Sequence, residues 1–138
     1  MLNESTGKFA LVVDRWDPKE VEGYTLVEYA GRGLGFSDDS ADPWAYGSYV
    51  GTYKFMPNGK WTGSGTGTET YKGGDTTTYT WEESSDFKQN NTYKYTGGTG
   101  KYEGASGGGT YTNYEGVSAS YKPVTLQGCQ YKDEIVLP

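Results

Sequence analysis

Glycine recurs at every second position in two segments of this sequence, from Gly31 to Gly35 and from Gly63 to Gly67. Residues two apart along a β-strand point to the same face, so each segment has a strand face without side chains. Such a face lets a sheet coil sharply, or lets aromatic rings from neighbouring strands lie across the backbone. The pattern therefore favours a small closed barrel, whose interior is wide enough to hold one small ligand.

Signals for β-strands follow one another along the whole chain, with turns at regular spacing. They predict strands over residues 9–13, 23–36, 46–55, 61–71, 76–83, 92–96, 110–115, 117–122 and 125–131. We expect Asp17-Pro18 to end the first strand, Asn58-Gly59 to form a type I′ hairpin turn, and residues 97–109 to form a glycine-rich connection. Seven to nine strands without a convincing helix predict one all-β domain, residues 1–138, folded as an antiparallel barrel or a sandwich.

The large apolar side chains of this chain are mostly aromatic, with 14 Tyr, 4 Trp and 4 Phe. Because each Tyr or Trp buries roughly 150–250 Å² when packed, we expect rings to build the core. With no His and a single Cys, the sequence excludes His-based catalytic triads, imidazole acid–base chemistry, an internal disulfide and a cysteine-rich zinc site. Cys129 is therefore expected to be a packed thiol.

Charge and hydropathy exclude further classes of partner. A net charge of −6 argues against nucleic acid and anionic membranes, and no apolar run approaches the roughly 20 residues that span a bilayer. The acidic segment 38–42 matches no calcium-binding loop, and 98–101 lacks the ending and the helix of a phosphate-binding loop, so we expect no metal and no cofactor. The first residues lack a secretory signal, which predicts a cytoplasmic protein if the sequence is complete and a secreted or periplasmic one if a signal was removed.

The segment 95–107 follows the pattern Thr-Gly-Gly-x-Gly-x-aromatic-x-Gly-Ala-x-Gly, through Thr96, Gly97, Gly98, Gly100, Tyr102, Gly104, Ala105 and Gly107. It resembles the glycine-rich signature of the allene oxide cyclase and dirigent barrels. Allene oxide cyclases also carry a glutamate in an early barrel strand, and Glu28 resembles that residue. The resemblance implies an eight-stranded barrel with a central apolar cavity, often trimeric, that guides a cofactor-free cyclisation, isomerisation or coupling. A homodimer or homotrimer is compatible with it.

Glu28 is the first candidate catalytic residue, together with Arg32 and Tyr53. Glu28 shares a strand face with Tyr24 and Leu26, so if that face points inward, its carboxylate lies among apolar groups. Such surroundings raise the pKa of a carboxyl group and suit it to acid–base catalysis. Arg32, on the same face, would pair with Glu28 or hold a substrate anion. If the face points outward, the two form an exposed ion pair of under about 1 kcal/mol.

Aromatic residues at alternate positions of successive strands are candidate substrate-binding residues. They are Tyr24, Tyr49, Phe55, Trp61, Tyr79, Trp81, Tyr93 and Tyr95. In a barrel these rings would line a cavity, with phenol hydroxyls orienting polar groups of a ligand. The alternative is that they simply form the core. Glu83 shares the face of Tyr79 and Trp81 and is a second candidate inward carboxylate, although a charge at a strand end usually points to solvent.

Three functions remain open. The first is a cofactor-independent isomerase, cyclase or lyase acting on a small apolar or phenolic substrate, mainly by confinement and proton transfer. The second is a barrel that binds a hydrophobic ligand without chemistry. The third is a sandwich that binds carbohydrate through exposed Trp and Tyr. An inward carboxylate with a raised pKa distinguishes the first, because it is needed for catalysis and costly in a mere binder.

Overall fold

The computed structural model describes residues 2–86, 91–113, 119–121 and 124–138, with the side chains of 119–121 and 124–128 left out. Its strands are β1 (Leu2–Val21), β2 (Tyr24–Ser37), β3 (Ala45–Phe55), β4 (Trp61–Tyr71), β5 (Thr76–Ser84), β6 (Asn91–Gly98), β7 (Ser106–Asn113), β8 (Ala119–Tyr121) and β9 (Val124–Val136). The described helical element is one 3₁₀ turn, η1 (Gly100–Tyr102). Within the described ranges, no helix has the length and hydropathy to cross a membrane.

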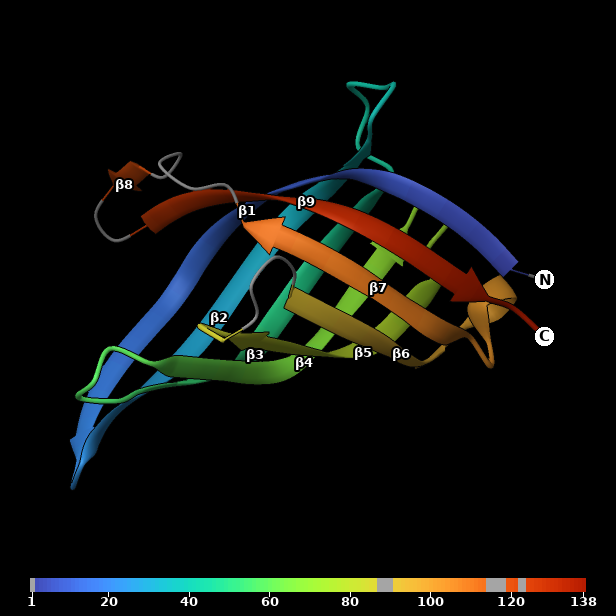
Figure 1. Cartoon of the computed structure of the whole chain (residues 1–138). Helices are drawn as coiled ribbons and strands as arrows, with labels where there is room; N and C mark the ends of the chain where they lie inside the picture. Colours follow the sequence, from blue (N-terminus) through green and yellow to red (C-terminus); the bar gives the residue numbers. More distant parts are fainter. Residues whose placement is uncertain (1, 87–90, 114–118, 122–123) are drawn as a thin grey trace.

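Eight strands close into an antiparallel barrel (Figure 1). The order is β1-β2-β3-β4-β5-β6-β7-β9, and β1 pairs with β9 to close the ring, from Leu2 opposite Val136 to Val13 opposite Thr125. The short strand β8 pairs only with the start of β9 among the described strands and lies outside the ring. The prediction of a closed eight-stranded barrel over a sandwich is confirmed.

The first strand is much longer than the sequence indicated. β1 runs through Asp17-Pro18, which we expected to end it, and continues to Val21. Its pairing with β9 stops at Val13, so beyond this point only β2 is hydrogen-bonded to β1. Proline is tolerated on such an edge because its missing N–H would face solvent. Past a bulge after Val13, β1 therefore forms an edge of the sheet, while β2 remains paired with β3 on its other side.

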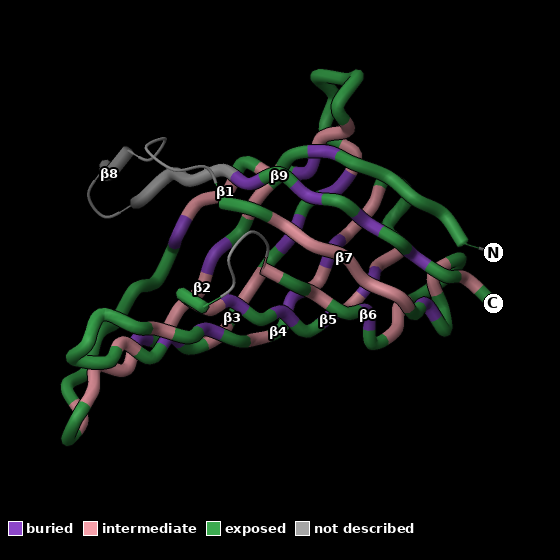
Figure 2. Tube along the Cα trace, viewed as in Figure 1, coloured by how far each residue is buried: buried purple, intermediate pink, exposed green. Residues whose placement is uncertain are grey.

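The glycine faces point into the barrel, and rings cover them. A Cβ atom built at Gly63 would lie 2.4 Å from the Tyr53 ring, and one built at Gly67 would lie 2.4 Å from the Tyr79 ring. Contacts that short leave no room for a side chain. The predicted role of these glycines, to let neighbouring rings lie flat across a strand, is confirmed, and buried residues follow the inner wall (Figure 2).

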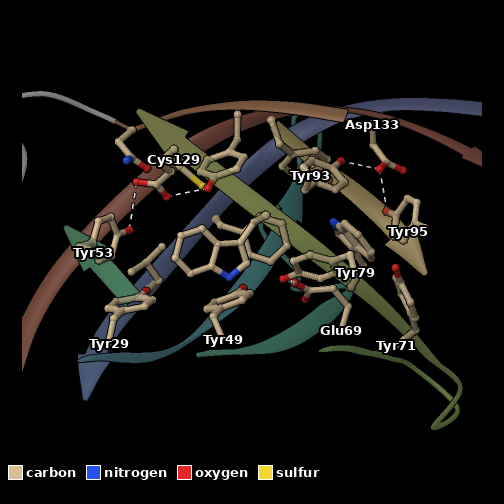
Figure 3. A pocket seen from close by; sticks show the side chains of 18 residues that line it. Tyr29, Tyr49, Tyr53, Glu69, Tyr71, Tyr79, Tyr93, Tyr95, Cys129 and Asp133 are labelled. Atoms are coloured by element: carbon tan, nitrogen blue, oxygen red, sulfur yellow. Dashed lines mark hydrogen bonds between the residues drawn. The ribbon is translucent and has the colours of Figure 1, made fainter. Parts of the chain in front are cut away.

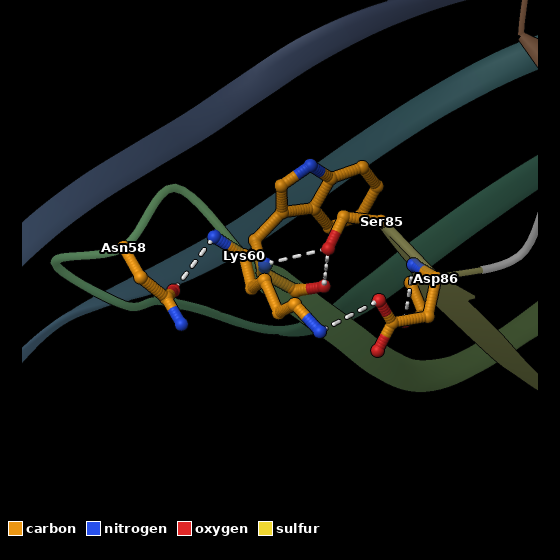
Figure 4. Close-up of polar contacts among 6 residues, drawn as sticks. Asn58, Lys60, Ser85 and Asp86 are labelled. Carbon is orange, nitrogen blue, oxygen red and sulfur yellow. Dashed lines mark hydrogen bonds and ion pairs between the residues drawn. The ribbon is translucent and has the colours of Figure 1, made fainter.

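The β3–β4 hairpin forms where Asn58-Gly59 predicted it, but the predicted type I′ turn is wrong. That type needs a positive φ at both central residues, and among the described residues only glycines have one. Gly59 takes a φ of 87°, a conformation that glycine adopts without strain. The Asn58 side chain accepts a hydrogen bond from the Lys60 amide at 3.0 Å, and Lys60 forms an ion pair with Asp86 at 3.4 Å (Figure 4). The Ser85 hydroxyl adds bonds to the backbone of Trp61, which ties the end of β5 to the start of β4 (Figure 4).

The glycine-rich segment 95–107 forms the end of β6, the turn η1 and the start of β7. Gly100 has a φ of 58°, and a Cβ there would lie 2.0 Å from the Asp75 carboxylate, so both its conformation and its surroundings require glycine. Gly104, with a φ of 74°, also needs a left-handed conformation. The expected connection over 97–109 is too long, because β7 already begins at Ser106. The turn expected at 88–91 lies mostly outside the described residues.

Candidate functional site

A cavity of about 110 Å³ lies inside the barrel. Since roughly 10–15 Å³ of such volume holds one water molecule, it is large enough for a small organic ligand. Rings and three carboxyl groups dominate its wall (Figure 3). The lining residues are Phe9, Leu11, Tyr29, Trp44, Tyr49, Tyr53, Glu69, Tyr71, Tyr79, Trp81, Glu83, Tyr93, Tyr95, Tyr111, Asn113, Cys129, Tyr131 and Asp133.

Glu69 on β4 is the most deeply buried of the three carboxyl groups, with 5% of its surface exposed. The Tyr79 hydroxyl donates to its Oε1 atom at 2.7 Å, and the Tyr49 hydroxyl also interacts with this carboxyl group by hydrogen bonding (Figure 3). Its Oε2 atom has no hydrogen-bond partner in the described part of the chain, nor does the buried indole N–H of Trp44. Buried polar atoms are nearly always paired, so these two atoms, one acceptor and one donor in residues of the cavity wall, are exceptions to the rule.

Glu83 and Asp133 repeat the arrangement of a carboxyl group held by phenols. Tyr53 and Tyr111 donate to the two oxygens of Glu83, at 3.0 and 2.6 Å. Asp133 accepts hydrogen bonds on one oxygen from the Tyr95 hydroxyl, at 2.6 Å, and from the Tyr93 hydroxyl (Figure 3). The three carboxyl groups come from β4, β5 and β9, so each is positioned by a different strand.

Burial sets the protonation of these groups. It raises the pKa of Glu69 to about 7, because loss of water penalises the charged form more than the Tyr79 and Tyr49 hydroxyls stabilise it, and the charge of Asp133 raises the pKa further. Burial also raises the pKa of Glu83 and of Asp133, against the opposing effect of their tyrosine hydrogen bonds. Glu69 can therefore either donate or accept a proton near neutral pH.

The cavity also contains the one cysteine. Cys129 is buried with 6% exposure, and burial raises the pKa of its thiol to about 12. A thiol with such a pKa is protonated and a poor nucleophile at neutral pH. The expectation of a packed thiol is confirmed.

The structure brings most of the predicted aromatic residues to the cavity. Those that line it are Tyr49, Tyr53, Tyr79, Trp81, Tyr93 and Tyr95. Phe55 and Trp61 pack against the core cluster instead, where both contact the Tyr53 ring beyond the cavity wall. Tyr24 lies outside the barrel, with the Lys54 ammonium 4.3 Å from the centre of its ring.

The expectation that Glu28 and Arg32 face inward is wrong. Both are exposed, because Val27 and Gly31 occupy the buried face of β2 and residues of the other parity point outward. The Glu28 carboxylate pairs with Arg15, and Arg32 pairs with Asp14 at 3.1 Å, all on the outer surface. The structure therefore does not bring these two residues together with Tyr53 or with the cavity.

Sequence reasoning missed Glu69 and Asp133 as site residues, although the signal for Glu69 was present. Glu69 shares its strand face with Gly63 and Gly67, and the glycine face is the one that rings cover. The same rule applied to β2 puts Gly31 inside and Glu28 outside. Asp133 was missed because the last strand was expected to end at residue 131, whereas β9 continues to Val136.

Comparison with known proteins supports the fold. No family model and no curated protein matches the sequence. The structure is similar to that of the pterocarpan synthase dirigent protein GePTS1, with a TM-score of 0.61, 13% identity, and coverage of 98% of this chain and 87% of that one. For the pterocarpan synthase dirigent protein PsPTS1 the TM-score is 0.62 at 12% identity, over 99% and 96% of the chains. The chain thus has the eight-stranded barrel fold of the dirigent proteins, which is related to the allene oxide cyclase-like barrels, as the segment 95–107 predicted.

Proposed function

We propose that this protein is a cofactor-independent isomerase, cyclase or lyase that acts on a small phenolic or other aromatic molecule held in the barrel cavity. The observation that carries the proposal is Glu69, a buried carboxyl group in the cavity wall whose pKa of about 7 suits both directions of proton transfer. The two structural neighbours are named as pterocarpan synthases, which supports a synthetic role for a barrel of this shape.

Confinement would supply one part of the catalysis. A closed ring of strands and a wall of aromatic side chains hold a planar molecule in few orientations, which lowers the entropy lost on reaching a reactive conformation. The wall also excludes most water, so interactions between a carboxyl group and the substrate are stronger than in solution.

Proton transfer would supply the other part. The Tyr79 hydroxyl donates to Oε1 of Glu69, whereas Oε2 has no hydrogen-bond partner in the described structure, so Oε2 is the oxygen that would exchange the proton. The carboxylate takes a proton from one carbon of the substrate and the carboxyl group returns a proton at a second position. Glu69 ends in its starting state, so the cycle consumes no oxidant, reductant or cofactor.

Proton exchange on a simple aromatic ketone tests this proposal. The protein is incubated with 4-hydroxyphenylacetone in D₂O, and deuterium uptake at the methylene group between ring and carbonyl is followed by NMR. General acid–base catalysis is worth about 10²–10⁴-fold, so we expect Glu69→Gln to reduce the accelerated exchange by about 100-fold or more. The exchange should also rise with pH through about 7, as Glu69 loses its proton.

Glu82→Gln is the matched control, because Glu82 is an exposed glutamate on the adjacent strand β5. It should exchange like the wild-type protein. Equal exchange in wild type and Glu69→Gln would contradict the catalytic role. If the ketone still quenched tryptophan fluorescence in both, the second function, a ligand-binding barrel without chemistry, would be favoured, because Trp81 lies in the cavity wall.

A further inference from the structure

The cavity wall has an unbalanced charge. Glu69, Glu83 and Asp133 line it, and no lysine or arginine does so among the side chains that the structure describes. Every lysine and arginine with a described side chain is exposed, on the outside of the barrel or in its turns. Buried carboxylates are normally paired with a cation. This cavity has three carboxyl groups in its described wall and no cationic side chain to balance them.

The hydrogen bonds inside the cavity do not remove this imbalance. The donors to the three carboxyl groups are tyrosine hydroxyls and, at Glu83, also the neutral side-chain amide of Asn113. Burial raises the pKa of these phenols, so they remain neutral. Neutral donors satisfy oxygen lone pairs without contributing a positive charge. A cation entering the cavity would therefore meet three acidic groups and no repulsive one.

One oxygen marks where such a cation would bind. Oε2 of Glu69 belongs to a side chain of the cavity wall that is 95% buried, and it lacks a hydrogen-bond partner in the described structure. The rings of Tyr49, Tyr71 and Tyr79 lie around this carboxyl group (Figure 3). Aromatic rings attract cations through their negative faces, and an ammonium group in such a setting gains both interactions.

We propose that the cavity selects a protonated amine carried on an aromatic body, with the ammonium group donating to Oε2 of Glu69. The inference deepens the proposed function and rests on it, because it assumes that the cavity is the ligand site. It names the charge of the substrate: cationic amines are preferred, their neutral counterparts bind more weakly, and carboxylates and other anions are rejected. The aromatic body of the ligand packs against the tyrosine and tryptophan rings of the wall.

Three molecules that differ only at one end test the inference. Tyramine, 4-ethylphenol and 4-hydroxyphenylacetate share a phenol ring, and their para substituents are a protonated aminoethyl group, an ethyl group and a negatively charged carboxymethyl group. Their affinities are measured by isothermal titration calorimetry at pH 8, where Glu69 is mostly charged. We expect tyramine to bind about tenfold or more tightly than 4-ethylphenol, and 4-hydroxyphenylacetate to show no binding.

Substitution of Glu69 should remove the preference and little else. In Glu69→Gln the affinity for tyramine should fall about tenfold or more, while that for 4-ethylphenol stays within about threefold, because the amide keeps the size of the side chain. The control Glu82→Gln, on the outer face of β5, should bind all three molecules like the wild-type protein.

A second measurement does not depend on any variant. At pH 7 about half of Glu69 is protonated, so an ammonium ion that requires the carboxylate should release about half a proton on binding. The heat of tyramine binding then changes between two buffers of different ionisation enthalpy, whereas the heat of 4-ethylphenol binding does not. The titratable groups facing Glu69 are Tyr49 from β3, Tyr71 from β4, Tyr79 from β5, and Cys129, Tyr131 and Asp133 from β9. Burial raises the pKa of the tyrosines and of Cys129, so these groups stay neutral and protonated at pH 7.

The outcomes separate the two proposals. Equal affinity for tyramine and 4-ethylphenol, or tighter binding of 4-hydroxyphenylacetate, overturns the charge preference and leaves the cavity as a ligand site. A tyramine preference that survives unchanged in Glu69→Gln overturns the assignment to Oε2. If none of the three molecules binds the wild-type protein, both the inference and the proposed function fail.

Discussion

Glu28 and Glu69 lie on comparable strands, β2 and β4, each with alternating glycines, yet they meet opposite surroundings. Glu28 is on the outer face and pairs with Arg15, and both side chains are more than half exposed. Glu69 is on the inner face, 5% exposed, and is held by neutral phenols. The two differ in parity relative to the glycines: Glu69 is an even number of residues from Gly67, and Glu28 is an odd number from Gly31. In this barrel, a charge on the glycine face is buried and a charge on the other face is solvated.

The pH dependence of the free energy of unfolding should show the largest difference between the two faces. Folding raises the pKa of Glu69 from its usual 4.5 to about 7, so the folded state binds this proton more tightly than the unfolded state. The stability that the proton supplies is complete below pH 4.5 and is lost as the pH rises to about 7. This loss is about 3 kcal/mol for Glu69, and Glu83 and Asp133 act in the same direction.

Denaturant unfolding at pH 5 and pH 8 measures this loss. Glu69→Gln replaces the carboxyl group by a neutral amide, so the variant should lose less stability over this range and be more stable than wild type at pH 8. Glu28→Gln, the same substitution on the outer face, should change the free energy of unfolding by less than about 1 kcal/mol, because its ion pair is exposed. A Glu69→Gln profile that coincides with wild type would show that the carboxyl group is not buried as described.

A methyl group added to the glycine face should have the next largest effect. In Gly67→Ala the new Cβ would lie 2.4 Å from Tyr79, which is buried and bonded to Glu69 and so cannot move freely. Overpacking of this kind costs about 1–3 kcal/mol. Ser64→Ala, on the exposed face of the same strand, should change the free energy of unfolding by less than about 0.5 kcal/mol. Equal effects at both positions would contradict the close approach of the ring.

Removal of one hydroxyl group from the cavity should lower the free energy of unfolding by somewhat less. Tyr111→Phe deletes the donor at 2.6 Å from Glu83 but leaves the bond from Tyr53. A hydrogen bond to an acidic group is worth about 1.5–3 kcal/mol, and the remaining donor offsets part of it, so we expect a loss of about 1–2 kcal/mol. Tyr46→Phe removes a hydroxyl from an exposed ring and should be neutral in the same thermal unfolding experiment. A neutral Tyr111→Phe would mean that this bond contributes nothing to stability.

The fold could be predicted from the sequence because local signals carried it: alternation, the Asn58-Gly59 turn and the glycine signature at 95–107 all act over a few residues. The site could be predicted only in part. The aromatic lining followed from composition, since few other side chains can fill a barrel. The inward carboxyl groups could not be predicted, because their positions depend on which face of each strand points into the closed barrel. Glu28 was chosen on an assumed face, while Asp133 lay in a polar tail whose pairing with β7 and β1 is long-range.

Removal of the outer ion pair should produce the smallest effect and so complete the comparison. The pair between Arg15 and Glu28 joins β1 and β2 on the outer surface, with both side chains more than half exposed, so water and salt screen it strongly. Arg15→Ala should therefore lower the free energy of unfolding by less than about 1 kcal/mol and leave the tyramine affinity unchanged. A loss as large as that of Gly67→Ala would mean that this exposed pair stabilises the fold as much as a buried contact does, and the contrast between solvated and buried charge would no longer follow from strand parity alone.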